Sequence, residues 1–278
     1  MAVNIFEKYG IKEVANVYFE ALDSDPSNGI EKGDIVLFLD TLKVSTIETT
    51  AENVAAQGGW GNPKLVMWDY GKEINLTLED ALISLESLRF MMGGAIKRSK
   101  ADEVVTVNLS EQATILEDGK VPVIRDHLDS NVEYTLPEKY RWVNMTQGTR
   151  GHDSITDAKK GDLVRFFWTQ EVVNEDAAIE ITISPNTFPG TYKVVGDTFM
   201  RSEKTGKDEP FQFVIGKAKV LSEVTITLEA EGDPSTFEMQ LNVLRSTNER
   251  GENEMMKLIR YNAGELTTKA AAEEEAGE

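Results

Sequence analysis

Short apolar or alternating runs recur along most of the chain, and their spacing constrains the fold more than any other feature. Ile179–Ile183 alternates cleanly, and Leu163–Trp168, Phe211–Ile215 and Phe237–Leu244 are runs of strand length separated by segments rich in Gly, Pro, Asn and Asp. Spacings of about ten residues between such runs are typical of an antiparallel β-sandwich or barrel. The pattern therefore predicts a mainly β fold.

Two pairs of runs near the N-terminus predict β-hairpins. Val14–Leu22 alternates between polar and apolar residues, and a loop of turn-forming residues separates it from the apolar run Ile35–Leu39. Leu65–Asp69 and Ile74–Leu78 flank a short segment centred on Gly71. A glycine between two such runs is typical of a tight turn, so these runs are interpreted as a second hairpin.

One segment has helical periodicity. Apolar residues within Leu78–Met92 recur every three or four positions, which places them on one face of an α-helix. Thr77 with Asp80 resembles a capping box at the start of this helix, and Ser84 would begin a shorter helix instead. Gly93 predicts the left-handed stop at the C-terminal end.

Composition restricts the chemistry. The chain has 278 residues, no cysteine, two histidines and a formal net charge of −19. The missing cysteines exclude disulfides, thiolate nucleophiles and Cys-ligated zinc. Nucleic-acid-binding proteins neutralise phosphates with Lys and Arg, so this charge has the wrong sign for gripping DNA. It fits a soluble, abundant protein, and equally a surface along which DNA passes without sticking.

Each histidine stands next to a carboxylate, in Asp126-His127 and in His152-Asp153. A metal site would require both pairs to converge with further ligands, so we interpret them as residues of surface loops. We predict no metal site and no cofactor.

Other chemical motifs are incomplete. The loop Asp23–Asp34 resembles a calcium loop, but its glycine is displaced, Pro26 interrupts it, and an aspartate stands where a bidentate glutamate belongs. The glycines of Gly58–Gly61 precede a strand instead of a helix, which excludes a dinucleotide fingerprint, and Gly206 lacks the rest of a phosphate-binding loop. No Gly-x-Ser-x-Gly turn is present. Nothing selects a catalytic pair among the many carboxylates, and the chain is predicted not to be an enzyme.

The four tryptophans receive different interpretations. Trp68 and Trp168 lie in apolar runs and are predicted to be core residues. Trp60 lies in the glycine-rich segment Ala51–Pro63, interpreted as a loop, where burial against a neighbouring subunit is expected. Trp60 or Trp142 could instead stack against a sugar ring.

The chain contains no apolar run long enough to span a bilayer and no secretory signal at its N-terminus. We therefore expect synthesis in a cytoplasm and no membrane insertion. One β-rich domain is predicted over residues 1–262. The Ala- and Glu-rich residues 263–278 are predicted to form an acidic, disordered tail.

About half of the chain resembles a known family. Leu42–Leu82, with Gln-Gly-Gly-Trp-Gly-Asn-Pro at its centre, resembles the major tail tube proteins of long-tailed bacteriophages that infect Gram-positive bacteria. The same resemblance extends to Ile183–Gly196, Asp208–Phe213 and Val224–Met239. Residues 101–162 match no part of it and are interpreted as an insertion or decoration.

The resemblance implies an antiparallel β-sandwich with one flanking helix. Six copies would close into a ring with an inner β-barrel, and rings would stack into a virion tail tube that delivers DNA without binding it specifically. The implied partners are further copies of the chain, the tail tip, terminator and tape-measure proteins, with or without a surrounding sheath. Acidic side chains are expected to line the lumen. The predicted contacts between rings are Gln57, Gly58, Gly59, Trp60, Gly61 and Asn62.

Two alternatives stay open at this point. Another virion structural protein, of a baseplate or a capsid decoration, would assemble into discrete particles instead of tubes. A carbohydrate-binding β-sandwich would bind glycans through Trp60 or Trp142 and would lose that binding when the tryptophan is replaced.

Overall fold

The structure is a computed structural model that describes residues 7–226, 236–248 and 250–262. It contains two compact units: the first holds the residues up to Ala95 and from Ile181 onward, and the second is Ile96–Glu180. The sheets in both units are antiparallel, and α1 is the single α-helix of the described residues. The predicted fold class, mainly β and antiparallel with one flanking helix, is therefore confirmed.

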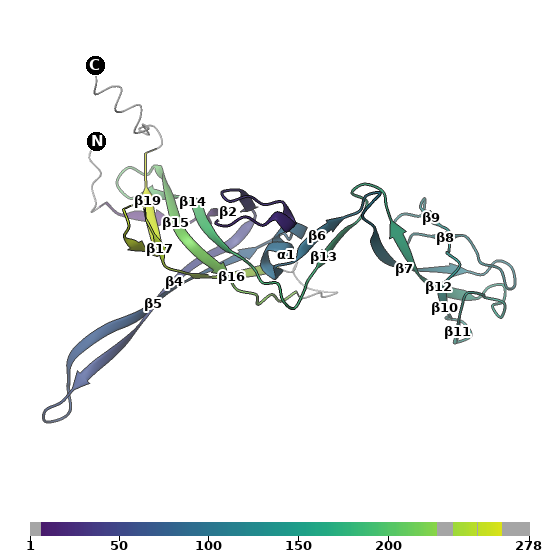
Figure 1. Ribbon diagram of the computed structural model, residues 1–278, viewed down its shortest axis with the longest axis horizontal. Coiled ribbons are helices and arrows are strands. Elements are labelled where there is room, and N and C mark those ends of the chain that lie inside the picture. The colour runs from purple at the N-terminus through teal and green to yellow at the C-terminus, as the bar shows by residue number, and fades with distance from the viewer. Residues whose placement is uncertain (1–6, 227–235, 249, 263–278) are drawn as a thin grey trace, which may run out of the picture. The chain divides into compact units, whose positions relative to one another are not determined.

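The first unit is built on a nine-stranded sheet (Figure 1). Its strand order is β3-β2-β14-β15-β16-β5-β4, with β1 added to β14 and β19 added to β15. A separate pair, β17 and β18, lies between β16 and β19 in the chain. The elements are β1 (Tyr9–Ile11), β2 (Asn16–Ala21), the 3-10 helix η1 (Pro26–Asn28), β3 (Ile35–Leu39), β4 (Leu42–Gln57), β5 (Lys64–Asp80), α1 (Leu85–Met92), β14 (Thr191–Ser202), β15 (Asp208–Val220), β16 (Phe237–Val243), β17 (Ser246–Thr247), β18 (Asn253–Glu254) and β19 (Met256–Arg260).

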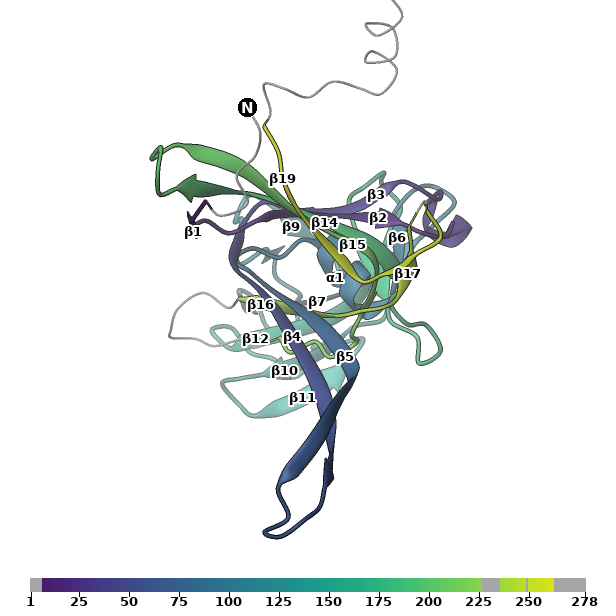
Figure 2. The same cartoon turned by 90° about the vertical axis from the view of Figure 1, so that its left-hand side faces the viewer.

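Apolar side chains on one face of this sheet pack around α1, and the sheet curves about the helix (Figure 2). Alternate residues of β2 are buried, as its sequence pattern predicts. Phe90 of α1 lies against two rings of the sheet, with centroids 4.7 Å from Phe19 and 4.4 Å from Tyr192. Burying such an aromatic side chain stabilises the fold by about 1.5–3 kcal/mol.

The ends of α1 are set by local hydrogen bonds. Ser84 and Ser87 form a reciprocal capping box, in which each backbone N–H donates to the other hydroxyl at 2.9 Å. Gly93 ends the helix with φ 69°. The start at Ser84 is therefore confirmed, and the alternative start at Thr77 and Asp80 is wrong because both residues pair with β16 as part of β5.

Close packing of β14 against β15 depends on one glycine. Gly196 is directly opposite Phe213, which is only 3% exposed. The aromatic ring occupies the position that a Cβ on Gly196 would take. A glycine within a strand commonly marks such a close approach.

The second unit contains a four-stranded antiparallel sheet in the order β11-β10-β12-β7 and the short pair β8-β9. One face of the sheet covers a separate core that includes Trp142 and Trp168, each 4% exposed, so the core prediction for Trp168 is confirmed. The chain enters this unit in β6 and leaves it in β13, which pair with each other. The strands are β6 (Ala95–Arg98), β7 (Val105–Thr114), β8 (Ile124–Arg125), β9 (Glu133–Tyr134), β10 (Arg141–Asn144), β11 (Thr149–His152), β12 (Leu163–Val172) and β13 (Ile179–Thr182).

Residues 101–162 lie within the second unit, and their origin as an insertion stays a prediction. That residues 1–262 form one domain also stays a prediction. The acidic tail over residues 263–278 lies outside the described residues. Within the described part of the chain, no helix is long and apolar enough to cross a membrane.

Candidate assembly surfaces

The hairpin of β4 and β5 extends beyond the rest of its sheet (Figure 1). β16 pairs with β5 only between Asn75 and Asp80, whereas β4 stays paired with β5 up to the hairpin tip. The part of β4 from Thr49 to Gln57 is therefore in a two-stranded ribbon. At about 3.3 Å per residue, nine residues span about 30 Å.

This ribbon corrects the interpretation of Ala51–Pro63 as a loop. Ala51–Gln57 continues β4, and only the six residues of Gly58–Pro63 form the connection. The turn predicted at Gly71 is also wrong, because Lys64–Asp80 is one strand.

Gly71 instead lies in a β-bulge. Between the pair Thr50 and Glu73 and the pair Glu52 and Tyr70, β4 advances two residues and β5 advances three. Gly71 has φ 61°, the left-handed conformation that such a bulge favours. The bulge interrupts the pairing locally, and β5 pairs with β4 again from Tyr70 toward the tip.

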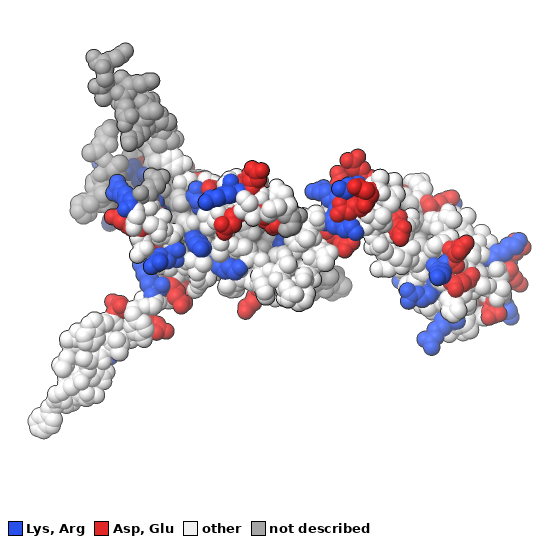
Figure 3. Space-filling view, in the orientation of Figure 1, with Lys and Arg blue, Asp and Glu red and all other residues white. Residues whose placement is uncertain are grey.

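The ribbon exposes apolar side chains. The first ten residues of β5, Lys64–Glu73, are all exposed, and the buried alternation begins only at Ile74. Cross-strand pairing places Val54 opposite Trp68 on one face. The core prediction for Trp68 is wrong, since the residue is 55% exposed. On the face shown in Figure 3, the outer part of this hairpin carries almost no charged groups.

The six predicted contact residues lie together at the tip. The N–H of Gly58 donates to the carbonyl of Pro63 at 3.2 Å, and the side-chain amide of Asn62 donates to Gln57 Oε1 at 3.1 Å. Gly59 and Gly61 have positive φ, which favours glycine. The side chain of Trp60, between them, is fully exposed. Their role as contacts between rings stays a prediction.

The outer part of the ribbon, residues 53–68, has Lys64 as its single charged residue and exposes several large apolar side chains, which is unusual for a protein that works alone. Monomeric proteins rarely expose contiguous apolar patches beyond a few hundred Å², and larger ones mark interaction sites. An exposed aromatic side chain at such a tip can anchor an interface. The hairpin is therefore the leading candidate for a contact with another protein chain.

A second candidate surface is an acidic face of the same sheet, across β4, β5 and β16. Glu79 and Glu238 are directly opposite each other on neighbouring strands, and Glu48 lies opposite Asn75 on the same face. A depression of about 400 Å³ beside this pair is lined by both glutamates and by Glu223. Like charges directly opposite each other destabilise a sheet, so this placement is costly for the isolated chain.

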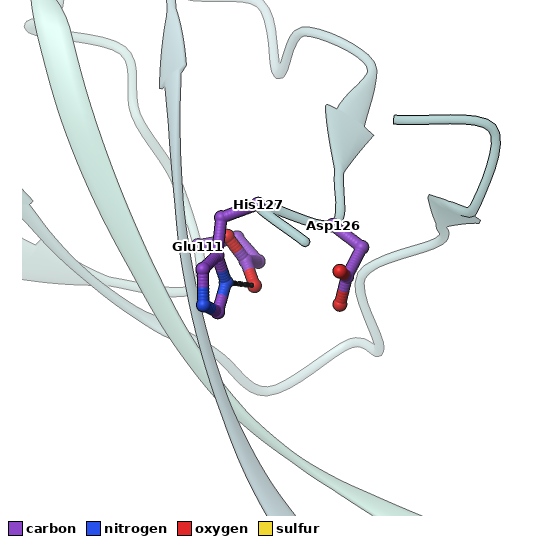
Figure 4. Close-up of side chains that lie close together, drawn as sticks. All are labelled: Glu111, Asp126 and His127. Carbon is purple, nitrogen blue, oxygen red and sulfur yellow. Dashed lines mark hydrogen bonds and ion pairs between the residues drawn. The ribbon is translucent and has the colours of Figure 1, made fainter. Parts of the chain in front are cut away.

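Glu111, Asp126 and His127 come together in the second unit (Figure 4). Glu111, 5% exposed, bonds through Oε1 to Nδ1 of His127 at 2.7 Å. This hydrogen bond and the carboxylate charge raise the pKa of His127. The oxygens of Asp126 accept hydrogen bonds from Tyr134 and from two backbone N–H groups.

These bonds determine what the cluster can do. The hydrogen bond from Tyr134, followed by the backbone bonds, lowers the pKa of Asp126, and the same bond raises the pKa of Tyr134 to about 12. Three side chains with oxygen and nitrogen donors could in principle hold a cation. Since each of these three side chains already forms hydrogen bonds within the protein, we interpret the cluster as a structural contact that holds residues 126–134 against β7.

The second histidine does not join this cluster. His152 ends β11, its side chain is 80% exposed, and its Nδ1 lies 3.5 Å from the carboxylate of the adjacent Asp153. The structure therefore does not bring the two histidines into one site.

Sequence reasoning did not single out the acidic face or the apolar side of the ribbon. The alternation of Asn75, Thr77 and Glu79 with buried residues identifies one polar face of β5. However, the glutamate of β16 that stands opposite becomes apparent only when the register is known.

The sheet and its projecting ribbon define a β-rich structural protein with surfaces suited to assembly. Comparison with family models assigns it more closely: the chain belongs to the YomU/Tube protein family, whose model matches residues 9–257. It is thus a phage tube-like structural protein and a component of the virion tail. A comparison with curated proteins finds no match to the chain.

Proposed function

We propose that this protein is the repeating subunit of a phage tail tube, in which copies close into hexameric rings and rings stack axially. The observation that carries the proposal is the β4–β5 ribbon, which presents a fully exposed Trp60 at the end of a paired outer part, residues 53–68, in which Lys64 is the single charged residue. Association with another chain that covers an apolar surface of this kind is favourable, because the surface is removed from water.

The sheet also offers a route to ring closure. In its strand order, β3 stands at one end and β4 at the other. Edge strands present unpaired backbone groups, and natural proteins cover them or pair them. In our proposal, neighbouring copies cover these edges within a ring, and the sheets together form the inner barrel.

The acidic face fits the wall of the DNA conduit. In this arrangement Glu48, Glu79 and Glu238 face the lumen and repel the phosphates of passing DNA. A lysine or arginine in the same place would make a favourable phosphate contact and slow transit. In this arrangement, the repulsion between Glu79 and Glu238 lowers the stability of the isolated chain, and it is retained because both side chains serve the conduit wall.

Further copies of the chain, the tail tip, terminator and tape-measure proteins are the partners in this proposal, with or without a sheath. An axial contact that does not close on itself produces a filament. Tail-tip proteins would therefore start growth and a terminator would end it.

Limited proteolysis tests the contact. Lys64, next to the tip, is exposed in the isolated chain and is a site for trypsin. We expect cleavage at Lys64 to be lost in sedimented assemblies and to persist in unassembled protein. Lys120, whose side chain is 66% exposed in the second unit, is the control site and should stay accessible in both. Equal cleavage at Lys64 in both states would contradict the proposal, and discrete particles would favour a baseplate or decoration protein.

A further inference from the structure

The four-stranded sheet of the second unit has an outward face opposite its core. Side chains alternate between the faces of a strand, and Trp142 and Trp168 belong to the buried face. Gly151 confirms the assignment, because a Cβ on this residue would collide with the ring of Trp142. The residues that directly precede or follow Trp142, Gly151 and Trp168 along their strands therefore have side chains on the outward face.

Three arginines from three strands gather on this outward face. Arg150 of β11 and Arg165 of β12 are opposite Val143 from its two sides. Arg141 precedes Val143 by two residues on β10 and so lies on the same face. All three arginines are exposed.

These arginines differ from most others in the chain. Among the described residues, none of the three lies within ion-pair distance of a carboxylate. The chain has ten arginines. Five of the remaining seven are ion-paired: Arg89, Arg98, Arg125, Arg201 and Arg260. Unpaired guanidinium groups concentrated on one face of a chain with net charge −19 indicate a surface suited to an anion.

The face is hollowed into a groove of about 740 Å³. Phe167 is half-buried in the groove and directly opposite Arg141. Of the three arginines, Arg141 and Arg150 line the groove, and Arg165 lies on the same face outside it. The groove is also lined by Asn108, Ser110 and Thr169, and the Thr169 hydroxyl donates to Asn108 Oδ1 at 3.0 Å. Cations, hydrogen-bonding side chains and an apolar floor are therefore available to a single ligand.

We propose that this groove binds an acidic glycan, that is, a chain of hydroxyl-bearing units carrying phosphate or carboxylate groups. Guanidinium groups match both anions with paired hydrogen bonds. The amide and hydroxyl groups suit the hydroxyls of the units, and the floor at Phe167 and Val143 suits the less polar face of a ring. This activity is separate from tube assembly.

The surface chemistry favours a glycan over a single-stranded nucleic acid. Nucleic-acid grooves combine cations with exposed aromatic rings on which bases stack. The outward positions of β7, β10, β11 and β12 carry no Trp or Tyr, and Phe167 is half-buried. The hydrogen-bonding side chains Asn108, Ser110 and Thr169 therefore outnumber the aromatic side chains at the outward positions of this face.

The test measures binding of the full-length chain to immobilised phosphomannan and polygalacturonate, with unsubstituted mannan as the neutral probe and a single-stranded oligonucleotide as a non-glycan polyanion. We expect binding to at least one acidic glycan, weaker binding to the other two probes, and weakening by at least about tenfold in R141Q/R150Q. The matched control R98Q/R125Q removes the same charge from the same unit and should bind normally.

Circular dichroism and sedimentation of the variants would show that folding and assembly are unchanged. Absence of binding to both acidic glycans would overturn the proposal. So would equal binding to neutral mannan, tighter binding to the oligonucleotide, or equal losses in the two double variants. Because assembly is measured separately, failure of this inference leaves the proposed tube function standing.

Discussion

Replacing Trp60 by alanine isolates the contribution of the hairpin tip. An aromatic side chain buries about 150–250 Å² in an interface, which at about 25 cal/mol per Å² corresponds to an upper bound of about 4–6 kcal/mol. Ordering costs reduce this, and tryptophans at the centre of interfaces contribute about 2–4 kcal/mol. The concentration required for assembly should therefore rise by about 30- to 700-fold.

The assay is sedimentation of assembled protein across a concentration series. Because Trp60 is fully exposed in the isolated chain, the free energy of unfolding should change by less than about 0.5 kcal/mol. The matched control is L128A, which removes an apolar side chain that is 86% exposed in the second unit. An unchanged threshold for W60A, or an equal shift for L128A, would refute the reasoning.

Three further predictions concern stability. G196A should lower the free energy of unfolding by about 1–3 kcal/mol in urea titrations, because the added methyl collides with the ring of Phe213. E238Q should raise it by up to about 1 kcal/mol at low salt and by less at high salt, since it relieves repulsion with Glu79. The raised pKa of His127 means that its bond to a buried carboxylate stabilises the fold below the ordinary pKa of 6.5, and that this contribution is lost as pH rises through the raised value. H127Q should therefore lower the thermal midpoint more at about pH 5 than at about pH 9.

Two of these predictions have a control variant in the same chain. G10A adds a methyl where no atom lies within 4 Å and should leave stability unchanged. E48Q removes a charge opposite an asparagine and should stabilise less than E238Q. For H127Q, an equal loss at both pH values would contradict the linkage argument. Equal effects of G196A and G10A would contradict the steric one.

Sequence patterns predicted the elements whose structure depends on residues close together in the sequence. β3 is the predicted run Ile35–Leu39, and the alternation before it contains β2. The helix end at Gly93 was also predicted, because a left-handed stop depends on the glycine itself. Trp168 was correctly placed in a core, because its strand has one face buried within the same unit.

The ribbon could not be predicted in this way. A left-handed glycine serves a tight turn and a bulge equally well, and only pairing with β4 shows that Gly71 belongs to a bulge. Trp68 lies in a run that resembles a core strand, and in the proposed assembly this resemblance arises because an interface selects apolar and aromatic residues as a core does. The register that unites Glu79 and Glu238 is a property of strands far apart in the sequence.

Cryo-electron microscopy of the full-length protein, concentrated alone and in the presence of tail-tip proteins, tests the central claim most directly. The account predicts hollow tubes of stacked hexameric rings, with the β4–β5 ribbon buried between successive rings and Glu48, Glu79 and Glu238 on the inner wall. Closed particles, or tubes in which Trp60 points into solvent and these glutamates lie on the outer surface, would contradict it.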